Sequence, residues 1–407
     1  MKKLYTFLFL LVGLAITSCS NKEQQPKYIF YFIGDGMGFS HVSITENYLH
    51  YLENDGAIGN QCLSFTKFPV LGMASTYSAS NNITCSSAAG TALSCGVKTN
   101  NGFLGVAPDS SAIYSIATAL QAKGYRIGVG SSVNINHATP AAFYGHSSDR
   151  NDYYTLALQL GESQYNYFGG GGFLDPQGKA GDQPSAYDIA QEKGYPIVHG
   201  YQAGKFNEMD RLFLLQTEEK RNQDLVSPSD RTAEDLTLSQ VVKAGIEVLH
   251  TPENTPFFLM VEGGKIDWFA HANNAKATIE ETLDFSKAIE VALEFYRQHP
   301  DETLIVVTAD HETGGFTMGR KGYSVDFSAL DQTVANTGNK DGKSYELSAE
   351  EQKELLRATN EASRLGWTTT GHSGGNVPVF AIGIGSEAFA GKMDNTDIPK
   401  RILSIAR

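Results

Sequence analysis

Cysteine is scarce in this chain of 407 residues, which has only four, at Cys19, Cys62, Cys85 and Cys95. Their spacing matches no zinc ribbon, so a structural zinc site made of cysteines is not expected. Cys19 lies in the N-terminal segment considered below, and setting it aside leaves three cysteines. An odd number in an exported protein means at least one free thiol, and the sequence leaves open which pair, if any, is oxidised.

Positive charge is also in short supply, because 32 Lys and Arg face 45 Asp and Glu, for a formal charge of -13. This balance argues against nucleic acid or an anionic membrane surface as a partner. The chain shows no internal repeat and no long low-complexity linker. Its length is sufficient for a large buried core.

The N-terminus has the features of an export signal. Lys2 and Lys3 precede an apolar run over residues 4–16, which is too short and too early for a stable membrane span. Small residues directly before Cys19 resemble a bacterial lipobox, so we expect cleavage and lipidation there, with ordinary cleavage nearby as the alternative. Residues 1–19 are then the signal peptide and residues 20–26 a tether. The protein is expected to be a periplasmic or outer-membrane-anchored lipoprotein that meets the membrane only through Cys19.

Apolar runs that alternate with helical patterns predict an α/β fold, a three-layer α/β/α sandwich with a large, mostly parallel central sheet. Strands are expected at residues 28–33, 73–80, 126–133, 165–168, 196–198, 257–261, 304–308 and 377–384. Helices are expected at residues 40–52, 113–123, 184–194, 230–250 and 398–406. Residues 322–367 are polar and change period often, so we expect them to lie outside the sheet.

Two of the expected strands end in groups that bind metals. Asp35 follows the first strand within a glycine-rich turn, and Asp310 and His311 follow the strand at residues 304–308. Active sites of α/β proteins lie at this carboxyl edge of the sheet. Taken singly, each acid is explained equally well as a turn former.

A third strand end and a late loop add further ligand types. Glu262 ends the strand at residues 257–261, and Asp267 and His271 lie four residues apart, on one face of a helix that starts near residue 266. His372 lies in a later glycine loop. Oxygen and imidazole groups without cysteine are typical of zinc in hydrolytic sites, and all-oxygen sets of magnesium.

Ser86 is the candidate nucleophile. It lies in the stretch TCSSAAGTALSCGVKT at residues 84–99, where hydroxyls gather at a helix N-terminus that favours an anion. Simple helix capping is the alternative for this stretch, and Thr84 and Ser87 are the alternative nucleophiles. Arg150 is the candidate phosphate-binding cation, because guanidinium binds phosphate with two bonds, although a surface ion pair also explains it.

With these motifs identified, the chain resembles the alkaline phosphatase family over essentially the whole mature sequence. The resemblance rests on the motifs IGDGMG, TCSSAAGTALSCGVKT, HATPAAFYGHSSDR, VEGGKIDWFAH, TADHETGG and GHSGG, in family order. It implies one catalytic domain over residues 27–407, with the crown-like insertion of larger relatives reduced to residues 322–367. Many members form dimers, although nothing in this sequence shows a homodimer.

The resemblance also implies two Zn²⁺ ions, one Mg²⁺ ion and a role for each candidate. The implied ligands of the first zinc are Asp267, His271 and His372. Those of the second zinc are Asp35, Ser86, Asp310 and His311. Magnesium would share Asp35 and add Thr139 and Glu262.

The implied reaction is hydrolysis of phosphate monoesters through a phosphoserine at Ser86, with Arg150 holding the phosphoryl oxygens. Two departures from the family pattern stand out. Cys85 replaces an aspartate that usually helps to orient the arginine, and Asp149 is a candidate replacement. His137 and Trp268 occupy variable positions, where we expect them to lie behind the magnesium ligands.

Other functions remain open at this point. A phosphodiesterase or sulfatase of the same superfamily is one alternative, against which Thr139, Glu262 and Arg150 argue. A non-catalytic metal- or phosphate-binding lipoprotein, degenerate at Cys85, is another, against which the complete ligand set argues.

Overall fold

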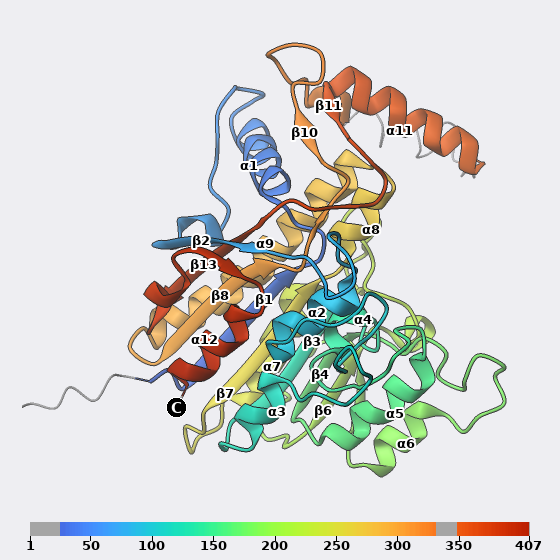
Figure 1. The fold of residues 1–407 in the computed structure, drawn as a ribbon, viewed down its shortest axis with the longest axis vertical. Helices are drawn as coiled ribbons and strands as arrows, with labels where there is room; N and C mark the ends of the chain where they lie inside the picture. Colours follow the sequence, from blue (N-terminus) through green and yellow to red (C-terminus); the bar gives the residue numbers. More distant parts are fainter. Residues whose placement is uncertain (1–24, 331–347, 407) are drawn as a thin grey trace, which may run out of the picture.

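The computed structural model describes residues 25–330 and 348–406, so the predicted signal peptide, Cys19 and most of the tether lie outside it. The central sheet contains β1 Tyr28–Gly34, β2 Val70–Ser75, β3 Arg126–Asn134, β4 Tyr167–Gly171, β5 Ile197–His199, β6 Leu212–Leu215, β7 Phe257–Gly263, β8 Thr303–Ala309, β13 Val377–Gly383 and β14 Gly391–Asp394. Their order across the sheet is β14-β2-β13-β8-β1-β7-β3-β4-β6-β5 (Figure 1).

Nearly all of the sheet is parallel, as predicted. Among its ten strands β13 runs antiparallel to both of its neighbours, β8 and β2, and the other pairings are parallel. All seven residues of β1 are buried, as are those of β7 and β8. A strand buried on both faces has a continuous apolar sequence, which is why these segments could be recognised without an alternating pattern.

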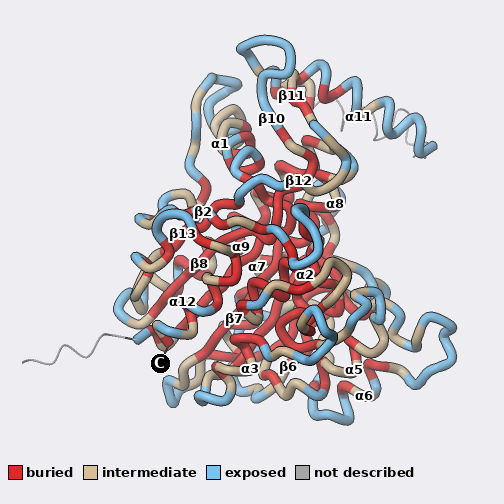
Figure 2. Tube along the Cα trace, in the orientation of Figure 1, coloured by how far each residue is buried: buried red, intermediate tan, exposed pale blue. Residues whose placement is uncertain are grey.

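Helices cover both faces of the sheet, which confirms the three-layer sandwich (Figures 1 and 2). One layer contains α1 Phe39–Glu53, α7 Leu238–Leu249 and α9 Ala275–Gln298, of which α9 contacts the other two. The other layer contains α2 Ser86–Cys95, α3 Ile116–Gln121, α4 Ala138–Ala141 and α12 Asp397–Ile405. Further α-helices of the described residues are α5 Tyr153–Ser163, α6 Ala186–Glu192, α8 Lys265–His271 and α11 Ala349–Ser363.

The helix predicted over residues 230–250 is wrong in its first third. It begins at Leu238, because Thr237 and Gln240 form a capping box that fixes the start of α7. Before it, the Asp235 carboxylate accepts hydrogen bonds from the backbone N–H and the hydroxyl of Thr232 and holds that segment in a turn.

Other boundaries also differ from the sequence interpretation. The strand expected at residues 73–80 is β2, which ends at Ser75, and the helix expected at 113–123 begins only after its N-cap, Ser115. The long helix α9, the helix α5 and the strand β6 were not predicted. The polar segment 322–367 lies outside the main sheet in its described parts, where it contributes α11 and β11 Leu365–Gly366, which pairs with β10 Thr317–Met318.

None of the helices within residues 25–330 and 348–406 is both long enough and apolar enough to cross a membrane.

Candidate active site

The site lies where β1, β7 and β8 end together. Gly34 at the end of β1 pairs with Gly263 of β7 and with Ala309 of β8, so the residues that follow leave the sheet at one level. Asp35 and Asp310 follow these ends directly. The structure therefore brings together strand ends that lie up to 275 residues apart in the chain, as the sequence predicted.

Asp35, Asp310 and His311 form the first of two candidate metal-binding groups, and all three are buried. Nε2 of His311 lies 3.4 Å from Oδ1 of Asp35 and 3.2 Å from Oδ2 of Asp310. The other carboxylate oxygen of Asp310 accepts hydrogen bonds from the backbone N–H groups of Gly36 and His311. Asp310 is thereby oriented with one oxygen left to face the group.

Asp267, His271 and His372 form the second group. The Nδ1 atoms of His271 and His372 donate to the carbonyl oxygens of Thr370 and Thr84, at 2.6 and 2.8 Å. The Nε2 atoms of the two rings therefore carry the lone pairs in the neutral form, and they lie 3.1 Å apart. Two lone pairs at this distance repel each other unless a proton or a metal ion lies between them.

Thr313, which the sequence interpretation missed, links the two groups. Its hydroxyl donates to Oδ1 of Asp267 at 2.5 Å and lies 3.2 Å from Nδ1 of His311, which is therefore the donor in that second contact. Thr313 belongs to the two-residue strand β9 Glu312–Thr313, which pairs with β12 His372–Ser373. Its position two residues after His311 was the available signal.

Burial, together with crowded carboxylates, raises two of the pKa values at the site. Burial, and then the charges of neighbouring carboxylates, hold the pKa of Asp35 and of Asp310 well above the usual range. Burial opposes ionisation of Asp267 as well, but the hydrogen bond from His271 and the nearby imidazoles outweigh it and lower that pKa. The three carboxylates Asp35, Asp310 and Asp267 repel one another when ionised, and a cation bound between them would remove this repulsion.

A third set of oxygens lies beside Asp35. Glu262 accepts a hydrogen bond of 2.5 Å from Ser131, its partner across β3 and β7, and its other oxygen has no hydrogen-bond partner among the described residues. Burial raises the pKa of Glu262 to about 7, although the hydrogen bond from Ser131 counteracts the shift. Ser131 was not predicted, and only the register of β3 and β7 identifies it.

These donor sets fit the implied ions. Both oxygens of Asp35, one oxygen each of Asp310 and Glu262, and the Thr139 hydroxyl are buried without a hydrogen-bond partner among the described residues. Leaving so many polar atoms unpaired is costly unless a cation binds them. The two groups with imidazole suit zinc, and the set with Glu262 and Thr139 suits magnesium, as expected from the sequence.

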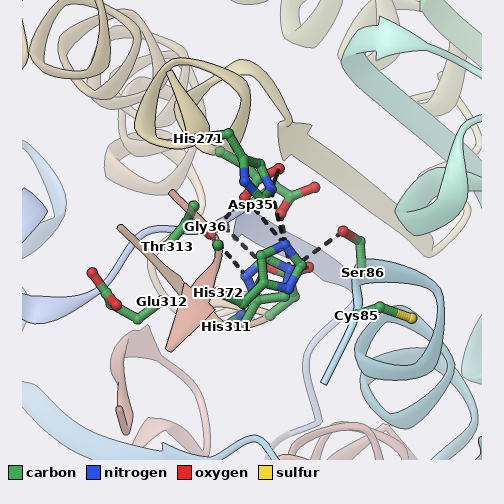
Figure 3. Close-up of polar contacts among 12 residues, drawn as sticks. Asp35, Gly36, Cys85, Ser86, His271, His311, Glu312, Thr313 and His372 are labelled. Atoms are coloured by element: carbon green, nitrogen blue, oxygen red, sulfur yellow. Dashed lines mark hydrogen bonds and ion pairs between the residues drawn. The ribbon is translucent and has the colours of Figure 1, made fainter. Parts of the chain in front are cut away.

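Ser86 is the hydroxyl that faces this cluster. It is the first residue of α2 and is buried, and its Oγ lies 3.3 Å from Nε2 of His311 (Figure 3). The alternative nucleophiles are engaged elsewhere, because the Thr84 hydroxyl donates to the carbonyl of Cys85 and the Ser87 hydroxyl contacts the Cys85 thiol. The geometry favours Ser86 among the three.

Arg150 is contacted by His137, which we expected from the sequence to lie only behind the magnesium ligands. Nη2 of Arg150 lies 3.3 Å from Nε2 of His137, and the His137 ring packs edge-on against Trp268 at 5.7 Å. His137 therefore contacts the arginine, in addition to lying near Thr139. Asp149, the predicted substitute for the family aspartate, is exposed and accepts hydrogen bonds from Asn151 instead.

Cys85 is linked to Arg150 through the backbone of Gly102. Its Sγ accepts a hydrogen bond from the N–H of Gly102, whose carbonyl accepts one from the N–H of Arg150. Burial opposes ionisation of the thiol, but hydrogen bonds from Ser87, Ala88 and Gly102 and the charge of Arg150 lower its pKa overall.

Comparison with known proteins agrees with this geometry. A sequence model of the family described as alkaline phosphatase matches residues 26–166 and 201–407. The chain belongs to the alkaline phosphatase family. It is 30% identical to alkaline phosphatase 3 of Bacillus subtilis over 429 aligned residues, which cover 93% of this chain and 89% of that protein.

Solved alkaline phosphatases share its fold. The enzyme from the Antarctic bacterium TAB5 is 30% identical with a TM-score of 0.75, and the match covers 95% of this chain and 99% of that chain. A cold-active enzyme from a Shewanella species is 29% identical with a TM-score of 0.78, covering 93% and 99% of the two chains. A variant of the TAB5 enzyme has been described with magnesium bound in a site called M3. The predicted family, fold and enzyme class are confirmed: this member of the alkaline phosphatase family is a phosphatase.

Proposed function

We propose that this phosphatase hydrolyses phosphate monoesters through a phosphoserine at Ser86, with two zinc ions and one magnesium ion at the three donor sets. The observation that carries the proposal is the position of the Ser86 hydroxyl, 3.3 Å from His311 at the edge of one imidazole-carboxylate group, with the second group alongside. A binding protein has no need of a buried serine at this position.

Each residue has a defined task in this reaction. The Ser86 oxygen attacks phosphorus, the bond to the leaving alcohol breaks, and water later splits the phosphoserine to release inorganic phosphate. Arg150 binds two oxygens of the transferred phosphoryl group while His137 orients its guanidinium. The N-terminus of α2 adds backbone N–H groups next to the same oxygens.

When bound, the metal ions would lower the pKa of the serine hydroxyl and offset the negative charge on the phosphoryl group. Asp267, His271 and His372 would hold one zinc, and Asp35, Asp310 and His311 the other. Thr139 and Glu262, together with Asp35, would hold magnesium.

The test compares hydrolysis of a phosphate monoester, a phosphate diester and a sulfate ester, each with and without a chelator. We expect fast monoester turnover that the chelator abolishes and that zinc with magnesium restores. Faster turnover of the diester or the sulfate ester would replace the proposal with the corresponding activity. No turnover in metal-loaded protein would support the binding-protein alternative.

The serine step has its own experiment. Ser86→Ala should abolish turnover while the metal content stays the same, and acid-quenched wild-type enzyme should carry one phosphoryl group on the peptide that contains Ser86. Ser87→Ala is the matched control and should remain active. Phosphorylation of a different peptide would contradict the assignment of Ser86.

We also propose that the protein is exported and anchored by a lipid on Cys19, and that it forms a homodimer. The basic start, the apolar run and the lipobox-like residues support the anchor, and the family resemblance supports the dimer. Cys19→Ala should release the protein from the membrane fraction, and light scattering of the purified catalytic part measures its oligomeric state.

A further inference from the structure

A cavity of about 440 Å³ adjoins the candidate active site and takes no part in the chemistry proposed so far. Its lining includes His271, which also belongs to the metal-binding group with Asp267 and His372, and Thr370, whose carbonyl accepts the Nδ1–H of His271. One wall is a face of α11, with Ala349, Gln352, Lys353, Leu356, Arg357 and Asn360. This spacing of three and four residues is that of a single helical face.

The helix that forms this wall is attached to the site. Nδ2 of Asn360, which is buried, donates to the carbonyl of Asn273 at 2.8 Å, two residues beyond His271. The start of α11 is fixed by a capping box between Ser348 and Glu351. The α11 wall of the cavity is therefore fixed in place beside the metal ligands by contacts within the described part of the chain.

The charge of the cavity is opposite to that of the protein as a whole. Arg320, Lys353 and Arg357 line it, and none of its lining residues is acidic, although the chain has a formal charge of -13. Among the described residues, neither Arg320 nor Lys353 has a carboxylate within ion-pair distance, and Arg357 has only the exposed Glu354 at 3.9 Å. Cations gathered in a concave site that has no acidic lining residue raise the local concentration of anions.

The cavity also offers apolar surface. Trp367 lines it, held in place by stacking on Phe316 with ring centroids 4.0 Å apart, and Leu356 lies on the α11 wall. An occupant that matches these features has a short carbon skeleton and an anionic group at its far end.

The reaction geometry indicates which part of a substrate reaches this cavity. Ser86 lies against His311, and in an in-line displacement the leaving oxygen departs on the side of phosphorus opposite to the serine. Of the two imidazole-carboxylate groups, the one that Ser86 does not contact contains His271. His271 thus belongs both to the group nearest the leaving oxygen and to the cavity wall.

Resting on the proposed monoesterase function, we propose that this cavity binds the leaving group and selects substrates that carry a second anionic group, above all a second phosphoryl group. Arg320, Lys353 and Arg357 bind that group, and Trp367 and Leu356 contact the carbon skeleton between the two phosphates. The bisphosphate of a short diol is then a better substrate than the phosphate monoester of the corresponding simple alcohol.

The experiment compares butanediol bisphosphate with butyl phosphate, with kcat/KM of the bisphosphate halved because it has two equivalent esters. We expect the wild-type enzyme to favour the bisphosphate by about tenfold at low ionic strength, and the preference to shrink as salt screens the exposed cations. The double variant Lys353→Glu with Arg357→Glu should lose the preference and leave kcat/KM for butyl phosphate within about twofold. The variant Lys123→Glu with Lys179→Glu makes the same change in net charge at exposed sites outside the cavity and should keep it.

Binding gives a readout without turnover. In the Ser86→Ala background, calorimetry compares butane-1,4-bisphosphonate with butylphosphonate. The bisphosphonate should bind about tenfold more tightly, and charge reversal on α11 should abolish the difference. Equal kcat/KM for the two esters, or a preference that survives the charge reversal, would overturn the proposal. If wild-type enzyme hydrolyses neither ester, the proposed function itself has failed, and the phosphonate measurement then decides separately whether the cavity binds a second anion.

Discussion

His137 and Arg150 are in contact, with 3.3 Å between Nε2 of the imidazole and Nη2 of the guanidinium. Burial, and then the positive charge of Arg150, lower the pKa of His137 to about 3, so the ring is neutral at physiological pH. A guanidinium nitrogen can only donate, so Nε2 is the acceptor and Nδ1 carries the proton. In this chain a neutral histidine contacts the arginine and supports it, a role for which the resemblance led us to expect a carboxylate.

Removal of this contact should weaken phosphate binding. We expect His137→Ala to lower kcat/KM for a monoester about tenfold, mainly through KM, because a hydrogen bond to a charged group is lost. The inhibition constant of inorganic phosphate should rise by a similar factor. Trp268→Phe, which keeps an aromatic ring against His137, is the control and should change both values less. An unchanged inhibition constant in His137→Ala would contradict this role.

Cys85 should influence Arg150 through Gly102. The Gly102 N–H donates to the thiol and the Gly102 carbonyl accepts the N–H of Arg150, so removal of the sulfur loosens the loop that holds the arginine. We expect Cys85→Ala to raise the inhibition constant of phosphate about threefold to tenfold, and Cys85→Ser, which retains an acceptor, to raise it less. Equal values for the two variants would show that the acceptor at this position has no effect.

The sequence predicted the strand-end residues because their signals are local. A buried run followed directly by Asp35, or by Asp310 and His311, can be recognised within about ten residues, and parallel strands bring such ends to one edge. The contacts that couple the residues are different. Thr313 reaches Asp267 across 46 positions of sequence, and the register of β3 and β7 pairs Ser131 with Glu262, so only the assembled fold reveals these contacts.

Other features were predicted wrongly or not at all, for equally physical reasons. Asp149 precedes Arg150 in the chain, but its carboxylate accepts hydrogen bonds from Asn151 in a local turn. The start of α7 depends on the capping box at Thr237, which a hydrophobic pattern does not indicate. The wall that α11 forms beside the site depends on a hydrogen bond from Asn360 to Asn273, which no sequence pattern indicates.

Thr313 should tune metal binding without being a ligand. Its hydroxyl orients Asp267 of one group and His311 of the other, and such supporting contacts typically change metal affinity by about tenfold to 100-fold. We expect Thr313→Val to lose zinc from both groups at lower chelator concentrations, whereas Thr313→Ser should behave like the wild type. Metal content after dialysis against graded chelator measures this. Tight retention of both ions in the valine variant would contradict the coupling.

Metal affinity should rise with pH up to about 8. The hydrogen bond to Asp267 raises the pKa of His271 to about 8, so below that pH a metal ion must displace a proton from Nε2. The apparent zinc affinity should fall about tenfold per pH unit below 8 from this group and level off above it. In metal-free protein the same shift stabilises the fold fully below pH 6.5, the ordinary pKa, and this contribution is lost as the pH rises through about 8.

Competition with a chelator of known zinc affinity between pH 6 and 9 measures this dependence. His271→Gln should remove the proton competition together with part of the affinity. His199→Gln, outside the candidate groups, should leave the pH profile as it is. A profile that is flat below pH 8 in the wild type would show that His271 is not protonated in the metal-free site.

Glu281 lies within α9 and should destabilise the fold at alkaline pH. Burial, and then the charge of Asp284, raise its pKa to about 7 against the opposing charge of Lys265, and its Oε1 has no hydrogen-bond partner among the described residues. Asp284 is itself bound by both terminal nitrogens of Arg231, at 2.8 and 2.9 Å, which leaves that guanidinium engaged with Asp284. The fold therefore favours protonated Glu281.

The sign of the effect follows from this shift. A carboxyl whose pKa rises from 4.5 to about 7 on folding costs nothing below pH 4.5, and its cost grows until the pH passes about 7. Glu281→Gln should thus increase the free energy of unfolding by up to roughly 3 kcal/mol above pH 8, with a gain that shrinks toward pH 5. Urea unfolding of metal-loaded protein at several pH values measures it, with Glu294→Gln on the exposed side of the same helix as the control. A gain that does not change between pH 5.5 and 8.5 would mean that Glu281 is ionised throughout this range, in contact with Lys265.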